Sequence, residues 1–199
     1  NNAFNGCSEI TEIHIPKSLK SCGFSIFADT GLKAVTFEDG IAEIPRYLFA
    51  NADTLERIEI PETVQRIDNL AFWNCDSLKT VIIPYGVTQI GQSAFCECIS
   101  LQELYIPDSV TGIEDSAFSL CRSLKYVNLP KKLEGMGNDV FNGCFNLTKI
   151  NIPKELSFCG SNIFAVTGLK KVTFEKDVMA IPDRLFDECD SLETITIPY

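Results

Sequence analysis

Apolar and polar residues repeat along this chain with a period of 22 or 23 residues. The clearest marker is a phenylalanine that recurs from end to end, as Phe4, Phe27, Phe49, Phe72, Phe95, Phe118, Phe141, Phe164 and Phe186. A fixed period of this length indicates one supersecondary unit that stacks on copies of itself. The pattern therefore predicts a solenoid, in which each unit buries its apolar side chains only against its neighbours.

Each unit opens with a short segment that predicts a β-strand. Counting positions from its opening leucine, the unit reads approximately L-x-x-I-x-I-P-x-x-V-x-x-I-x-x-x-x-F-x-x-C-x-S. Apolar and polar residues alternate in its first six positions, which is the period of a strand. The proline at position 7 of most units has no backbone donor, so it ends the strand.

The second half of the unit predicts the return to the next strand. Its apolar residues at positions 10, 13 and 18 suit a short extended piece followed by about one helical turn. Parallel strands joined in this way coil in the right-handed sense. We therefore predict a right-handed solenoid with a parallel β-sheet on its concave face and short extended or helical turns on its convex side.

Two units depart from the pattern in the same way. The units that begin at Leu32 and Leu169 lack the proline at position 7, and each follows a unit of 22 residues that ends in Thr-Gly. Residues 10–61 and 147–198 are identical at 29 of 52 positions, at an offset of 137 residues. This match indicates a higher-order repeat of six units. The alternative is that two irregular units adopt the same local solution.

The repeat occupies the whole chain. Eight full units lie between residues 10 and 191, with partial units at both ends. We therefore expect residues 1–199 to form a single array. Neither end has the polar cap that closes a solenoid core, so we also expect the array to be a fragment of a longer one. No apolar run has the length of a signal peptide or a membrane span.

Net charge and motifs exclude several classes of function. The net charge of −10 argues against binding to nucleic acid or to an anionic membrane surface, because both require a basic face. The sequence contains no Gly-rich phosphate loop, no His-Glu-x-x-His and no Gly-x-Ser-x-Gly motif. We predict no catalytic residues and no cofactor.

The cysteines follow the repeat. Cys22 and Cys159 occupy position 13, where other units have Ile or Met, and six others occupy position 21: Cys7, Cys75, Cys98, Cys121, Cys144 and Cys189. A residue that alternates with apolar residues behaves as a small core side chain, so we predict a buried ladder of thiols. Disulfides between stacked units are the alternative. Cys96 lies off the ladder and is expected to be partly exposed. One Cys-x-Cys with a single histidine is a weak metal signal, so no metal site is predicted.

The units 78–100 and 101–123 closely resemble the BspA-like bacterial class of leucine-rich repeats. The shared markers are the Ile-Pro after the strand, the Val-Thr-x-Ile-Gly segment or a near variant, the Ala-Phe pair and the closing Cys-x-Ser. The resemblance covers essentially the whole chain and implies a leucine-rich-repeat solenoid. It also implies a large secreted or surface-attached protein of a host-associated bacterium, with an adhesive role and no catalytic residues.

One group of side chains stands out on the predicted sheet. Positions 3 and 5 of each strand should point outward, and they are mostly polar. Ile82, Tyr105 and Tyr126 come from three adjacent strands and, with Thr80 and Asn128, form the predicted partner-binding patch. Tyrosine is a favoured anchor in protein interfaces. Cross-strand packing is the alternative. The sequence thus favours a non-catalytic protein-binding module, with a structural spacer as the alternative; the oligomeric state stays open.

Overall fold

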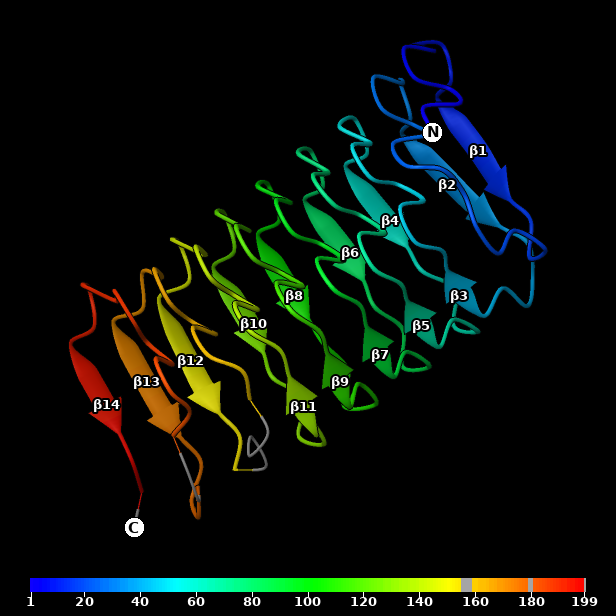
Figure 1. Cartoon of the computed structure of the whole chain (residues 1–199). Helices are drawn as coiled ribbons and strands as arrows, with labels where there is room; N and C mark the ends of the chain where they lie inside the picture. The colour runs from blue at the N-terminus through cyan, green and yellow to red at the C-terminus, as the bar shows by residue number, and fades with distance from the viewer. Residues whose placement is uncertain (155–158, 179–180, 199) are drawn as a thin grey trace.

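The computed structural model describes residues 1–154, 159–178 and 181–198. The chain forms a parallel β-solenoid of about 8 turns (Figure 1). Each coil contributes one strand to a long array that we call the main sheet. Its strands, in spatial order, are β1 (Glu12–Ile15), β2 (Ala34–Phe37), β4 (Arg57–Glu59), β6 (Thr80–Ile82), β8 (Glu103–Tyr105), β10 (Tyr126–Asn128), β12 (Lys149–Ile152), β13 (Lys171–Phe174) and β14 (Thr194–Thr196).

A second, narrower sheet runs beside the main sheet. It is built at positions 12 and 13 of the repeat, where the sequence predicts a short extended piece. Its strands are β3 (Glu43–Ile44), β5 (Arg66–Ile67), β7 (Gln89–Ile90), β9 (Gly112–Ile113) and β11 (Gly135–Met136). All paired strands in both sheets are parallel. The proline after each regular strand turns the chain between the two sheets; for example, the Val64 amide donates to the Pro61 carbonyl.

The recurring phenylalanines form a continuous stack through the core. Neighbouring ring centroids lie 4.9 to 6.1 Å apart, with interplanar angles of 2° to 22°. This spacing is close to the separation of about 4.8 Å between neighbouring strands, so one ring occupies each coil. Burial of each inner ring contributes about 1.5–3 kcal/mol. The contribution depends on the coils above and below, since each ring is covered only by its neighbours. At the open end of the stack, Phe4 is 40% exposed.

The turn side, which comprises positions 14 to 21 of each coil, contains no helix in the described residues, so the prediction of a helical turn is wrong. Positions 16 and 20 of every coil have φ between 51° and 75°, in the left-handed region. Two such residues four positions apart interrupt any right-handed helical turn. From Tyr47 to Gly143 the amides at positions 16, 18 and 20 donate to carbonyls of the next coil, for example those of Leu70, Phe72 and Asn74. Hydrogen bonds between coils therefore replace those that a helix would make within one.

The cysteine prediction is confirmed in the interior of the array. Cys75, Cys98, Cys121 and Cys144 are buried and all nine cysteines are free. Each of these four thiols donates to the carbonyl of the phenylalanine one coil earlier, at Sγ–O distances of 3.0 to 3.4 Å. The thiol therefore fills core volume and also satisfies a backbone acceptor.

The prediction that Cys96 is partly exposed is wrong, because this residue is buried and only 9% exposed. It occupies position 19, which Ala50 and Ala165 fill in other coils, and both alanines are buried. The tight turn between the two left-handed residues directs this position inward. Burial raises the pKa of the Cys96 thiol to about 11, and the charge of Glu97 adds to the shift.

The two irregular coils share one local structure. In each, position 9 has a positive φ, at Gly40 (+85°) and Asp177 (+67°). In each, the phenylalanine at position 6 meets a ring of the Phe stack edge to face, with 6.3 Å between the centroids. The match between residues 10–61 and 147–198 thus extends from the sequence to turn geometry and core contacts.

Candidate partner-binding face

The side chains of each main-sheet strand point alternately into the core and toward an outward face. In β8, Leu104 at position 4 is 1% exposed, whereas Tyr105 at position 5 is 66% exposed. The same pattern of exposed, buried and exposed residues holds in β4 and β6. Positions 3 and 5 therefore form the outer face of the main sheet, as the sequence predicts. Any partner of this face contacts side chains that the core does not use.

The structure brings the predicted apolar side chains together. Ile82 and Tyr105 occupy position 5 of the neighbouring strands β6 and β8, and Tyr126 occupies position 3 of β10, beside Glu103 of β8. Ile82 is 54% exposed and Tyr126 is 49% exposed. The three side chains thus form an exposed diagonal across three strands, which we call the aromatic patch.

The other two predicted residues of this patch differ in role. Thr80 is exposed at position 3 of β6. Asn128 is paired with Tyr105 in the strand register, but its carboxamide is occupied. Its Oδ1 accepts from the Ile106 amide at 2.9 Å, and its Nδ2 donates to the Ile106 carbonyl at 2.8 Å. Asn128 therefore links β10 to the end of β8, and its polar atoms have partners before any ligand arrives.

A groove at the C-terminal side of the aromatic patch was not predicted from the sequence. It has a volume of about 380 Å³, and Tyr126 is among the residues that line it. Lys149 and Lys171, at position 3 of β12 and β13, line it together with Lys131, which follows the proline after β10. We call it the lysine groove. The sequence does contain a signal for this groove. Lys149 and Lys171 share position 3 of their units, and the unit before them has Tyr126 at that position.

Several charges on and beside the N-terminal strands of the main sheet are paired within the protein. The Nζ atom of Lys17 lies 2.9 Å from Glu38, and that of Lys79 lies 2.9 Å from Glu56. The hydrogen bond from Lys17 holds the pKa of Glu38 below its usual value, and the lysine's charge adds to the effect. Exposed pairs of this kind contribute little to stability, so their main consequence is that these four charged groups already have partners within the protein.

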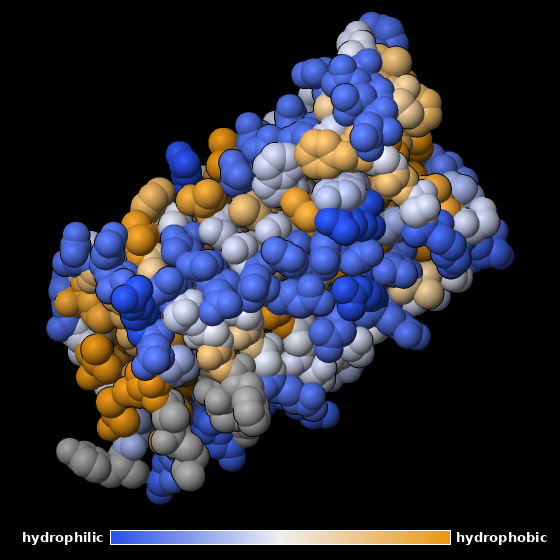
Figure 2. Space-filling model, in the orientation of Figure 1, coloured by the Kyte–Doolittle hydropathy of each residue, from blue (hydrophilic) through white to orange (hydrophobic). Residues whose placement is uncertain are grey.

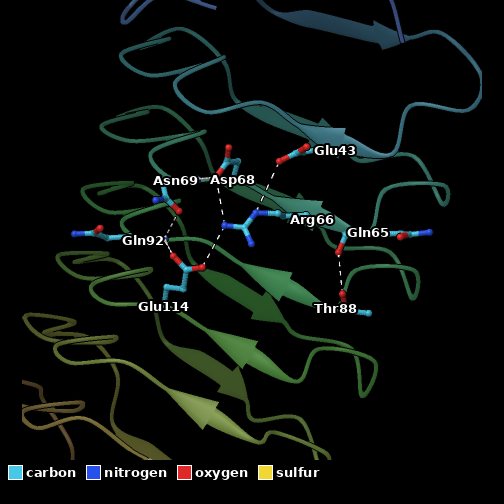
Figure 3. A network of polar contacts seen from close by, with 8 residues as sticks. All are labelled: Glu43, Gln65, Arg66, Asp68, Asn69, Thr88, Gln92 and Glu114. Carbon is cyan, nitrogen blue, oxygen red and sulfur yellow. Dashed lines mark hydrogen bonds and ion pairs between the residues drawn. The ribbon is translucent and has the colours of Figure 1, made fainter. Parts of the chain in front are cut away.

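The second sheet carries another groove, of about 450 Å³, over glycine-rich strands β9 and β11. At its edge Arg66 bridges three carboxylates on different coils (Figure 3): its guanidinium lies 3.8 Å from Glu43, 3.4 Å from Asp68 and 3.2 Å from Glu114. Glu114 also accepts from the amide of Gln92. The charged groups at this edge are therefore occupied by contacts within the solenoid.

Exposed apolar residues also gather at one end of the array. Hydrophilic side chains cover most of the face in Figure 2, but apolar ones cluster over β13 and β14. Ile195 of β14 and Ile197, just after it, are each about half exposed. In the described part of the chain no coil packs on the far side of β14, which accounts for this exposure. We therefore leave these residues out of the candidate face.

The described residues offer no further site for a metal ion and no membrane-spanning helix. Among residues 1–154, 159–178 and 181–198, no three His, Cys, Asp or Glu side chains group in a way that could hold a metal ion. The same residues include no helix that is long and apolar enough to cross a bilayer.

Strand stacking, the Phe ladder and the variable outer face define a leucine-rich-repeat solenoid. The sequence matches the family described as BspA type leucine rich repeat region over residues 1–102 and 88–199. The chain therefore belongs to the BspA-type leucine-rich repeat family, as the resemblance of its units implies. Members of this family are typically bacterial surface proteins and are generally protein-binding or adhesion-like.

Solved bacterial structures share the fold. A leucine-rich repeat protein of Bacteroides ovatus is 24% identical, with a TM-score of 0.63, over 98% of this chain and 62% of its own. A leucine rich cell surface protein of Faecalibacterium prausnitzii is 26% identical, with a TM-score of 0.58, over 99% and 62%. A leucine-rich repeat protein of T. pallidum is 27% identical, with a TM-score of 0.64, over 76% and 75%.

The chain is shorter than most of these neighbours, since it spans 62% of the Bacteroides and Faecalibacterium proteins. No curated protein sequence matches it significantly. These similarities establish the family and the fold.

Proposed function

We propose that this array is a non-catalytic protein-binding module of a secreted or cell-surface bacterial protein, and that it binds through the outer face of the main sheet. The observation that carries the proposal is the aromatic patch: Ile82, Tyr105 and Tyr126 lie exposed on three neighbouring strands of an otherwise polar face. The partner would be a host or cell-surface protein, in keeping with the adhesion-like character of the family.

The aromatic patch exposes apolar surface to water, which costs free energy. Each tyrosine leaves a large apolar ring in water and presents a hydroxyl at its tip. Such side chains bind well because they bury a large area and lose little conformational entropy. The patch leaves them exposed although the core is complete without them. Burial against a partner would recover this area.

The test is a capture experiment on the purified array, immobilised against a panel of purified extracellular proteins and polysaccharides. We expect saturable binding to a protein. Tyr105→Ala combined with Tyr126→Ala should weaken it at least tenfold, at an unchanged melting temperature. The control is Phe145→Ala, which removes a ring that is similarly exposed but follows the cysteine of the turn side. Absence of binding by a folded array would favour the structural spacer instead.

A further inference from the structure

The lysine groove leads to an inference about the chemistry of the partner, and this inference rests on the proposed function. We propose that this groove, between Tyr126 and the lysines of β12 and β13, binds an extended acidic segment of the partner protein. The aromatic patch, which ends at Tyr126, would take apolar side chains of the same segment.

The groove lies on the outer face of the main sheet. Tyr126, Lys149 and Lys171 come from position 3 of successive strands, and Asn151 and Thr173 come from position 5. The outer face therefore forms the floor of the groove. Because Tyr126 belongs to both surfaces, the groove and the aromatic patch are continuous.

Two of its lysines occupy directly opposite positions on neighbouring strands. Lys149 and Lys171 are directly paired in the parallel register of β12 and β13, and neighbouring strands are about 4.8 Å apart. Like charges at directly opposite positions of a sheet repel. A carboxylate bound between the two ammonium groups would replace this repulsion with attraction, so the array has a physical reason to bind one.

Within the described residues the lysines of the groove form no ion pair, in contrast to Lys17 and Lys79. Every ion pair in that part of the chain lies between Lys17 and Glu114. Lys131, Lys149 and Lys171 form none. One acid, Glu175, also lines the groove, and its Oε2 accepts from the Lys154 amide at 3.5 Å. Three ammonium groups and one carboxylate leave the groove positive.

This positive site belongs to an acidic protein. Residues 1–115 contain 7 Lys and Arg and 17 Asp and Glu, a net charge of −10, whereas residues 116–199 contain 10 of each and are neutral. An acidic ligand would thus be attracted to one region of the face and repelled by the other. This asymmetry would fix the orientation in which it binds.

A peptide fits the whole surface better than an anionic polysaccharide. A sulfated or carboxylated polysaccharide would pair with the lysines but would leave Ile82 and Tyr105 exposed. A protein segment that carries both acidic and apolar side chains would cover the groove and the aromatic patch together.

The test uses short fluorescent peptides of alternating glutamate and leucine, with a glutamine and leucine peptide as the neutral probe. Binding to the whole chain is followed by fluorescence anisotropy at low salt. We expect the glutamate peptide to bind at least tenfold more tightly than the neutral one, and the difference to shrink as salt is added. Lys149→Gln with Lys171→Gln should abolish the difference.

The matched control is Lys17→Gln with Lys79→Gln, which removes two paired lysines from the other half of the molecule and should leave binding unchanged. Equal affinity for the two peptides, no binding at millimolar peptide, or equal loss in both double variants would overturn the inference. Binding of heparin in place of the peptide would also overturn it. If the tyrosine variant loses protein capture and the Lys149/Lys171 variant retains it, the proposed function stands and the acidic-segment inference fails.

Discussion

The turn side and the outer face of the main sheet belong to the same coils but follow opposite rules. On the turn side a stacked phenylalanine and two left-handed residues recur in each full coil, and from Tyr47 to Gly143 the amides also donate to the next coil. On the outer face the side chains change from coil to coil, from Glu59 through Ile82 to Tyr105. Repetition is required where coils pack on each other, whereas a surface that selects a partner requires variation.

The comparison predicts that stability depends on the turn side and core, and that binding depends on the outer face. The strongest test is to remove a ring from the Phe stack. Phe118 is fully buried between Phe95 and Phe141, so Phe118→Ala should lower the free energy of unfolding by about 3–5 kcal/mol. Urea unfolding followed by circular dichroism measures this change.

Tyr105→Ala is the outer-face control for that measurement, and it should change the free energy of unfolding by no more than about 0.5 kcal/mol. A loss at Tyr105 as large as that at Phe118 would show that the outer face also supports the fold.

A smaller effect is expected at a left-handed turn position. Gly143 has φ of +72°, and an added Cβ would lie 2.6 Å from the Leu120 Cδ2 atom. Gly143→Ala should destabilise the array by about 1–2 kcal/mol for the left-handed backbone alone, and the contact with Leu120 should add to this loss.

Gly40→Ala separates the two contributions, because Gly40 has φ of +85° and open space around its Cα. Thermal unfolding of both variants should show the larger drop at Gly143. Equal drops would mean that the Leu120 side chain moves aside without cost.

The smallest effect is expected at Asp53, one position after the turn side. Burial raises the pKa of its carboxyl, and the nearby charges of Asp76 and Asp29 raise it further. Its Oδ1 is buried without a hydrogen-bond partner. Because its pKa is higher in the folded than in the unfolded state, ionised Asp53 destabilises the fold above the folded pKa. This cost disappears as the pH falls below the unfolded value.

Asp53→Asn should therefore raise the melting temperature at pH 7 and have little effect at pH 3, below the usual aspartate pKa of 3.8. Differential scanning calorimetry at the two pH values checks this. A gain of equal size at both would assign the effect to the new amide's hydrogen bonds and not to the removed charge.

Much of the core could be predicted from the sequence, because each coil packs mainly on the coils before and after it. A contact between neighbours then appears as a residue repeated 22 or 23 positions later. Phe72 and Phe95 stack at 4.9 Å for this reason, and Cys98 and Cys121 take equivalent buried places. The diagonal of Ile82, Tyr105 and Tyr126 followed from the same register.

The turn conformation could not be predicted in this way. Residues such as Tyr47, Leu70 and Val166 adopt positive φ, although their side chains disfavour the left-handed region. The amides of these residues donate to the next coil, and such bonds exist only once the coils are stacked. Local propensity therefore predicted a helical turn, and hydrogen bonding between coils overrides it. The burial of Cys96 follows from the same turn.

The sequence alone determined the solenoid, its period, its Phe stack and the strand positions that face outward, because all of these depend on contacts between equivalent positions of adjacent coils. Only the tertiary structure decided which charges are satisfied. Arg66 reaches Glu114 across 48 residues, past the coil that has Gly91 at the equivalent position, while Lys149 and Lys171 form no ion pair with any described residue. The physical reason is that long side chains pair according to the space that the folded surface leaves them, and the repeat does not encode that space.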